Sequence, residues 1–276
     1  MLLLDAANFT TKVLLYAASL GGIAAALHGA LGFHTRRRAY LWFAALVAGA
    51  AALRLVVLNA QMGGSLASAF SLEQFGWTWA GGGRLALALF AGAALLAMSA
   101  GFKNRAVPLL AAGSISAAFA LTGHTAGLAS PGFAPWIVLG HLLIAGFWLG
   151  APATLWPRTT TTDAEVLGRT EAFSRIARLI VPLLFASGLY LFWRINGGFE
   201  TALATGYGRL LAAKLMLATV ILGLGALNMT LVTRQLISDP AKGRAALRST
   251  LRIDAILFAV ILVLIAAATT LSGPTE

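Results

Sequence analysis

The chain has 276 residues, of which 59% are hydrophobic and 11% are charged. A soluble domain carries about 25% charged residues, so this composition excludes an ordinary soluble protein and indicates a membrane protein. Lys and Arg together number 20 against 9 for Asp and Glu, which gives a formal net charge of +11, and the absence of cysteine excludes disulfides and thiolate metal sites.

Apolar stretches separated by charged, Gly-rich or Pro-rich breaks predict an all-α polytopic membrane protein. A transmembrane helix needs roughly 20 mostly apolar residues, and helices satisfy their own backbone hydrogen bonds in lipid. We predict about eight such helices in a single transmembrane domain over residues 1–276. They are placed near residues 9–33, 39–60, 80–101, 105–122, 135–156, 171–195, 206–236 and 247–271.

The basic residues predict the orientation, because Lys and Arg accumulate in short cytoplasmic loops. Most of them fall in or beside the first, third, fifth and seventh loops, which we therefore place in the cytoplasm, with both termini outside. Since the positive charge is spread over four loops, it does not indicate nucleic-acid binding. These residues are Arg36, Arg37, Arg38, Lys103, Arg105, Arg158, Arg169, Arg175, Arg178, Arg234, Lys242, Arg244, Arg248 and Arg252.

A few basic residues lie on the other side of this predicted topology. Arg84 is near a helix end, where its charge can reach the membrane surface, whereas Arg54 and Lys214 lie deeper. Lys214 also shares one helix face with Tyr207 and Asn228, at spacings of seven and fourteen residues. This polar stripe is expected to face the bundle interior, where it either lines a transport pathway or forms hydrogen bonds between helices.

Two histidines are candidate metal ligands. His124 stands at the end of the fourth predicted helix, and His141 lies about two turns into the fifth, with Trp148 on the same face. A short loop joins the two helices, so both imidazoles are expected in one outer-leaflet site, although a lone His in a membrane is also commonly a hydrogen-bonded core residue. Imidazole suits late transition metals and haem.

Other candidate ligands stand apart from this pair. His28 lies at the opposite end of the first helix and is a candidate exit site, whereas a solvated role is preferred for His34, beside a run of arginines. Methionine thioethers are ligands that Cu(I) accepts, but methionine is also a common residue of hydrophobic cores. They occur at Met62, Met98, Met216 and Met229.

Five short strings resemble the CopD (PcoD) family of bacterial copper-resistance inner-membrane proteins: "LTGH", "HLLIAGFWLG", "AFSRIA", "TGYGRLLAAK" and "LN" at Asn228. The resemblance covers roughly residues 110–270. Asp254 stands where family members tend to carry Glu. The positions that the resemblance carries over are His124, His141, Trp148, Gly150, Phe173, Ser174, Tyr207, Gly208, Lys214 and Asn228.

The resemblance implies copper transport across the bacterial inner membrane, from periplasm to cytoplasm, in copper homeostasis or resistance and without catalytic turnover. It also implies a periplasmic CopC-like copper carrier as a partner. Two alternatives stay open: a haem b electron-transfer protein with His124 and His141 as axial ligands, and a copper-delivery or assembly factor that does not transport. No P-loop is present, which disfavours ATP-driven pumping.

Overall fold

A computed structural model describes residues 2–33, 35–122, 126–128 and 130–271 of the chain, without the side chains of residues 2 and 271. The described residues are 85% helical, and no strand occurs among them. Seven helices there are long and apolar enough to cross a membrane. The prediction of an all-α polytopic membrane protein is therefore confirmed, whereas a single domain over residues 1–276 stays a prediction.

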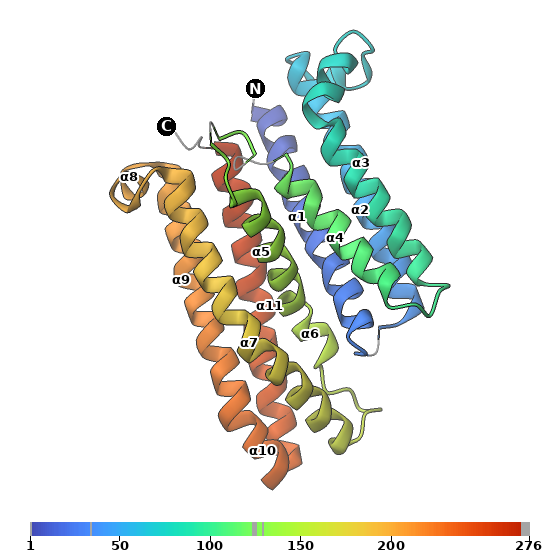
Figure 1. The fold of residues 1–276 in the computed structure, drawn as a ribbon, viewed down its shortest axis with the longest axis vertical. Coiled ribbons are helices and arrows are strands. Elements are labelled where there is room, and N and C mark those ends of the chain that lie inside the picture. The colour runs from blue at the N-terminus through green and yellow to red at the C-terminus, as the bar shows by residue number, and fades with distance from the viewer. Residues whose placement is uncertain (1, 34, 123–125, 129, 272–276) are drawn as a thin grey trace.

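The helices follow one another along the chain with short connections (Figure 1). The long ones are α1 (Leu2–Ala30), α2 (Arg37–Met62), α3 (Phe75–Ser99), α4 (Ala106–Ala120), α5 (Ala134–Leu149), α7 (Asp163–Asn196), α9 (Gly206–Leu227) and α11 (Pro240–Leu271). The short ones are η1 (Leu66–Phe70), α6 (Ala151–Thr154), α8 (Phe199–Ala204), the π-helix η2 (Asn228–Val232) and α10 (Thr233–Ser238).

Helices α1, α3, α7 and α11 begin five to eight residues before their predicted spans, and local capping explains this for α7. α7 begins eight residues before the predicted 171 because Thr162 and Glu165 form a capping box, in which each side chain accepts a hydrogen bond from the other's backbone N–H. The prediction began at the apolar run and missed this polar first turn. α7 ends at Gly197, whose φ of 70° is the left-handed conformation that favours glycine.

Two predicted spans are shorter in the structure. The predicted helix at 135–156 breaks between α5 and α6, where Pro152 follows Gly150. The predicted helix at 105–122 is α4, whose 15 residues span about 22 Å at 1.5 Å per residue, less than the roughly 30 Å of a bilayer core. A count of eight crossings thus stays a prediction.

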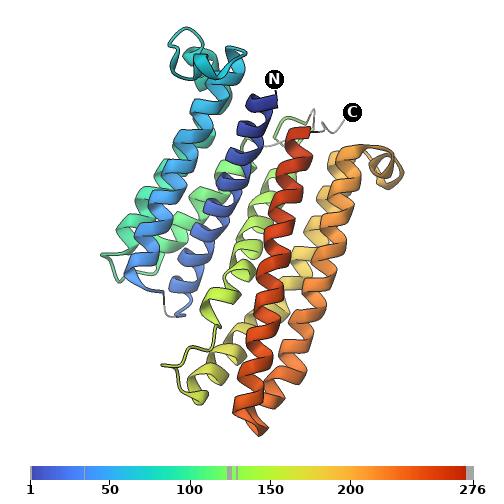
Figure 2. The same cartoon turned by 180° about the vertical axis from the view of Figure 1, so that it is seen from behind.

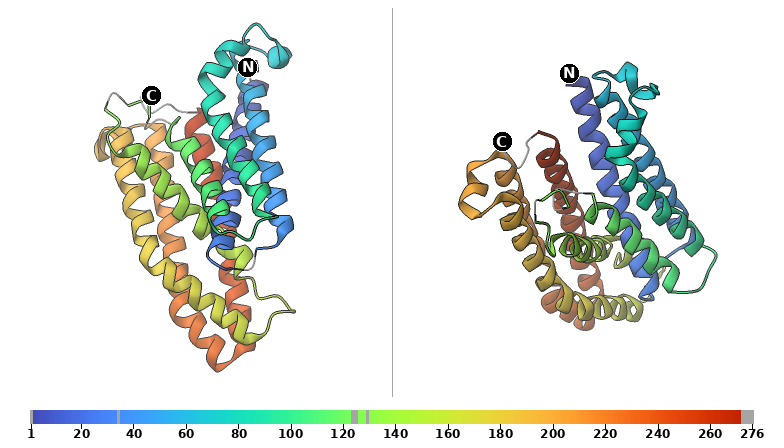
Figure 3. Two further views of the ribbon diagram at one scale, coloured as in Figure 1. Left: turned by 45° about the vertical axis from the view of Figure 1, so that its right-hand side comes forward. Right: turned by 45° about the horizontal axis from the view of Figure 1, so that its top comes forward.

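The helices form two neighbouring groups, α1–α4 and α5–α11, each with its own buried cluster of apolar side chains. α1 and α4 pack against α5, and α1 also packs against α11 (Figures 1 and 2). α5 therefore lies between α1 and α4 on one side and α7 on the other (Figure 3). The second group, built from α5, α7, α9 and α11, contains most of the candidate residues.

Helix α1 begins and α11 ends at the same end of the molecule (Figure 1). We call this the N/C end, and the opposite end, where α7 and α11 begin, the loop end. That the N/C end faces outside the cell stays a prediction. A reporter that works only outside is expected to be active when inserted near Ser130 and silent near Asp163; activity at Asp163 would reverse the orientation.

Gly208 provides a test of the packing between α8 and α9. A Cβ at this position would collide with the backbone carbonyl of Ala202 in α8, which has no flexible side chain to move aside. Gly208→Ala is expected to destabilise the protein by about 1–3 kcal/mol, the usual cost of overpacking. Thermal unfolding in detergent measures this. Gly223→Ala on α9 is the matched control, because nothing lies within 4 Å of its added Cβ, and it should be neutral or slightly stabilising. Equal melting temperatures for the two variants would contradict this packing.

Candidate functional site

Two cavities lie one after the other along the interior of the second group of helices. Each is lined by residues of α5, α7, α9 and α11, and their volumes are about 210 Å³ and 200 Å³. The larger, which we call the N/C-end cavity, contains His141 and Lys214. The smaller, which we call the loop-end cavity, contains Asn228 and Asp254.

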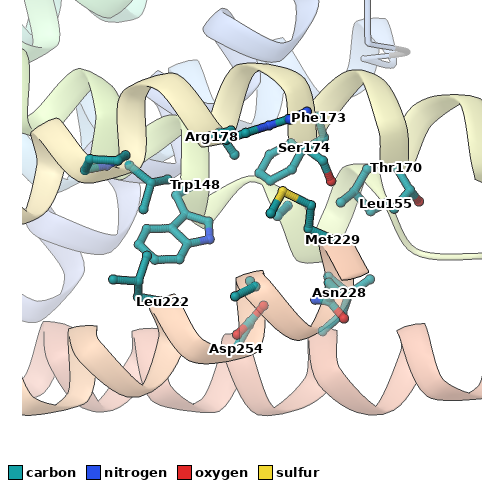
Figure 4. Close-up of a pocket in the computed structure, with 17 residues that line it drawn as sticks. Trp148, Leu155, Thr170, Phe173, Ser174, Arg178, Leu222, Asn228, Met229 and Asp254 are labelled. Atoms are coloured by element: carbon teal, nitrogen blue, oxygen red, sulfur yellow. The ribbon is translucent and has the colours of Figure 1, made fainter. Parts of the chain in front are cut away.

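An apolar layer separates the two cavities. Trp148 of α5, Val181 of α7 and Leu222 of α9 line both of them, and the ring of Phe258 in α11 meets the Trp148 indole edge-on at 6.0 Å. We call Trp148, Val181 and Leu222 the plug. The indole of Trp148 stands at one end of the loop-end cavity (Figure 4). A cation that moves along the bundle interior from one cavity to the other must pass the plug.

The ring of His141 lines the N/C-end cavity, and its hydrogen bonds define its tautomer. The Ser187 hydroxyl donates its proton to the Leu184 carbonyl at 2.9 Å, so the 2.9 Å contact between Ser187 Oγ and His141 Nδ1 requires the imidazole to donate. Nδ1 therefore carries the proton, and Nε2 keeps its lone pair. The absence of a side chain at Gly188 makes room for the ring, since a Cβ there would lie 3.3 Å from His141 Cε1. Second-shell partners orient metal-binding imidazoles in this way.

Lys214 lines the same cavity and lies close enough to His141 for their charges to interact. It forms no hydrogen bond or ion pair with any described residue. The remaining lining is almost entirely apolar, so the amine is poorly compensated there. This cavity thus combines an imidazole nitrogen with a nearby amine on the facing helix.

The polar residues of the loop-end cavity occur where two helices are irregular. Asn228 and Met229 open the π-helix η2, and such π-helical turns are frequent at functional sites. In α7, Pro182 lacks the N–H that would pair with the carbonyl of Arg178, and both residues line the cavity. Asn228 Oδ1 accepts a hydrogen bond of 2.6 Å from Thr250 of α11, which fixes its amide.

His28 is placed differently from His141. It is 2% exposed, and its ring lies among Phe33, Phe147 and Phe173. Its Nε2 donates to the Phe147 carbonyl at 2.8 Å, so Nδ1 accepts from the Thr154 hydroxyl. Since both nitrogens are in use, a metal would have to displace one of these hydrogen bonds, and the structure gives His28 a packing role between α1 and α5.

The other predicted site residues are dispersed. Arg54 donates to Asn8 at 2.6 Å and lines a separate cavity beside α3, and Arg84 is exposed on α3. Tyr207 is buried in the first turn of α9 and lines neither cavity of the second group. His124 lies outside the described residues, as does His34, so a site shared by His124 and His141 stays a prediction.

The structure adds residues that the sequence did not single out as a site. Asp254, Arg178 and Thr170 line the loop-end cavity, together with Ser174, which the resemblance already carries over (Figure 4). The acidic residue between apolar residues of α11 was the available signal for Asp254, whereas Arg178 belongs by sequence to the basic loop residues. The described residues contain no group of three or more His, Cys, Asp or Glu side chains that could hold a metal.

A family model matches part of the chain. The model for copper resistance protein D (CopD) matches residues 167–268, which include most of α7 and α11 and all of α9. No curated protein and no solved structure matches. The resemblance seen in the short strings is confirmed for this segment, which supplies three of the four helices around both cavities.

Proposed function

We propose that this chain moves copper across the bacterial inner membrane, through the interior of the second group of helices, in copper homeostasis or resistance. Together, the CopD match and the seven apolar helices indicate a multi-pass membrane protein related to copper resistance. The observation that carries the transport proposal is the pair of cavities on either side of the plug, because a path across a bilayer requires internal space on both sides of a barrier.

The proposed direction, from periplasm to cytoplasm, is the one that the resemblance implies, with the N/C end outside as predicted. Copper enters at the N/C end, where His141 Nε2 offers a nitrogen ligand that a late transition metal accepts. His124 is the proposed second ligand there. A periplasmic CopC-like carrier is the proposed donor. Copper then passes the plug into the loop-end cavity and leaves on the cytoplasmic side. Ion passage past an apolar constriction requires that the constriction open or become wet.

Metal analysis, a visible spectrum and an uptake assay test the proposal together. The purified chain is expected to bind copper, to lack a Soret band, and to carry copper into sealed liposomes that contain a copper-sensitive dye. A Soret band would favour the haem b alternative. Copper binding without uptake would favour a delivery or assembly factor and overturn transport.

Replacement of Lys214 tests whether this residue acts in the pathway or has a purely structural role. Replacement of a buried, poorly compensated charge by an apolar side chain is often neutral or stabilising, so Lys214→Met should leave the melting temperature unchanged or higher. If the amine takes part in the pathway, the same variant should lose copper uptake, measured in the liposome assay. Lys214→Arg keeps the charge and is the control. Wild-type uptake by Lys214→Met would remove Lys214 from the mechanism.

A further inference from the structure

We propose that the loop-end cavity is a second copper subsite, in which the carboxylate of Asp254 and the thioether of Met229 bind the ion after it has passed the plug. This inference rests on the proposed function and extends it to a place where copper pauses in transit. It starts from a buried acidic group that the packing of the protein leaves unused.

Asp254 is 2% exposed, yet its Oδ1 has no hydrogen-bond partner among the described residues. Asp254 lines the loop-end cavity (Figure 4). Buried charged groups in proteins are normally paired or bound to a metal, because an uncompensated charge in an apolar setting is costly. A buried carboxylate with an unpaired oxygen, in the wall of a cavity of about 200 Å³, therefore marks a position for a cation.

Met229 gives the site its preference for copper. Its sulfur lies at the cavity across from Asp254, carried by the first turn of η2 (Figure 4). Thioether ligands select Cu(I) among the common metal ions, and the carboxylate adds the negative charge that offsets the ion. Ser174 also lines this cavity and adds a hydroxyl oxygen to its wall.

The surrounding charges are compatible with a weakly held ion. Arg178 of α7 is the one other charged residue that lines the cavity in the described part of the chain, and it forms no ion pair with Asp254. Its positive charge opposes tight retention of a cation. A transported ion must leave as well as enter, so moderate affinity is what a transit site requires.

Copper stoichiometry tests the subsite without relying on transport. The full chain is titrated with Cu(I) against a coloured Cu(I) chelator, for the wild type and for His141→Ala, Asp254→Asn and Met229→Leu. Asp254→Asn and Met229→Leu keep the side-chain size, so both should fold normally. Each is expected to lose one of the wild-type copper equivalents, while the His141 site keeps its affinity. Met216→Leu is the control, because Met216 lies on α9, which runs directly into η2, but it is 69% exposed and lines neither cavity.

The outcomes separate the two proposals. His141→Ala combined with Asp254→Asn should lose both equivalents, because sites on opposite sides of the plug contribute independently. If Asp254→Asn and Met229→Leu bind as much copper as the wild type, the second subsite is wrong and the proposed function stands. If the wild type binds no copper at all, both proposals fail.

Discussion

His141→Ala is expected to abolish copper uptake and to weaken copper binding at the N/C-end cavity by more than any other single replacement. The reason is that Nε2 is the imidazole lone pair left available by the hydrogen bond from Nδ1 to Ser187. Loss of an outer-shell partner of a metal ligand costs roughly 10–100-fold in affinity. We therefore expect a loss within that range for Ser187→Ala and a larger loss for His141→Ala, measured by chelator competition.

Leu142→Ala is the matched control for this experiment. Leu142 neighbours His141 and lines the same cavity, so its truncation enlarges the cavity and reduces packing without removing a nitrogen ligand. It should lower the melting temperature and leave copper affinity intact. His124→Ala should add little once His141 is gone, if the two imidazoles hold one ion and act as a unit. Wild-type binding by the double variant would show that neither imidazole binds copper.

The spans of this fold were predictable from sequence because each apolar run is long enough to fix a helix by itself. What failed were helix ends and interruptions, which depend on single capping, Gly or Pro residues. The first turn of α7 is polar, and the capping box of Thr162 and Glu165 holds it in the helix. The shortening of α5 depends on Gly150 and Pro152, which interrupt a run that is otherwise apolar.

The candidate site was predictable only where a residue type carries its own chemistry. His141 and Lys214 stand out in an apolar helix, and the structure places both at one cavity. Asp254 was visible as an acid, but its unpaired oxygen and its proximity to Met229 depend on how α11 packs against the π-helical turn of α9. For His28 the residue type predicted a metal ligand, but both of its ring nitrogens form hydrogen bonds within the protein.

The division of the interior into two cavities could not be predicted from spacing, because it depends on the plug, whose members come from three helices. Trp148 contributes the largest side chain of that layer and is 6% exposed. Val181 and Leu222 are ordinary apolar residues in the sequence. Only their common position at both cavities identifies them as a barrier.

Trp148→Ala is expected to join the two cavities and to let ions pass through the protein passively. Removal of a buried Trp costs about 3–5 kcal/mol of stability. A constriction blocks ions because it stays dry, so its removal admits water and lowers the barrier to ion passage. A barrier lower by only about 1.4 kcal/mol already makes the leak about tenfold faster. Passive release of copper, and of a cation that the protein does not transport, from loaded liposomes measures this.

Trp148→Phe keeps an aromatic ring in the plug and separates leakage from misfolding. It should retain most of the barrier while sharing part of the loss of stability. Trp136→Ala is the second control, because Trp136 lies near the start of α5 and is 69% exposed, so its removal leaves both cavities unchanged. Trp148→Ala and Trp136→Ala would contradict the proposal if both fold and release ions from liposomes at the same rate. The two cavities would then not lie on one conduction path, and the copper route must be sought outside the interior of α5, α7, α9 and α11.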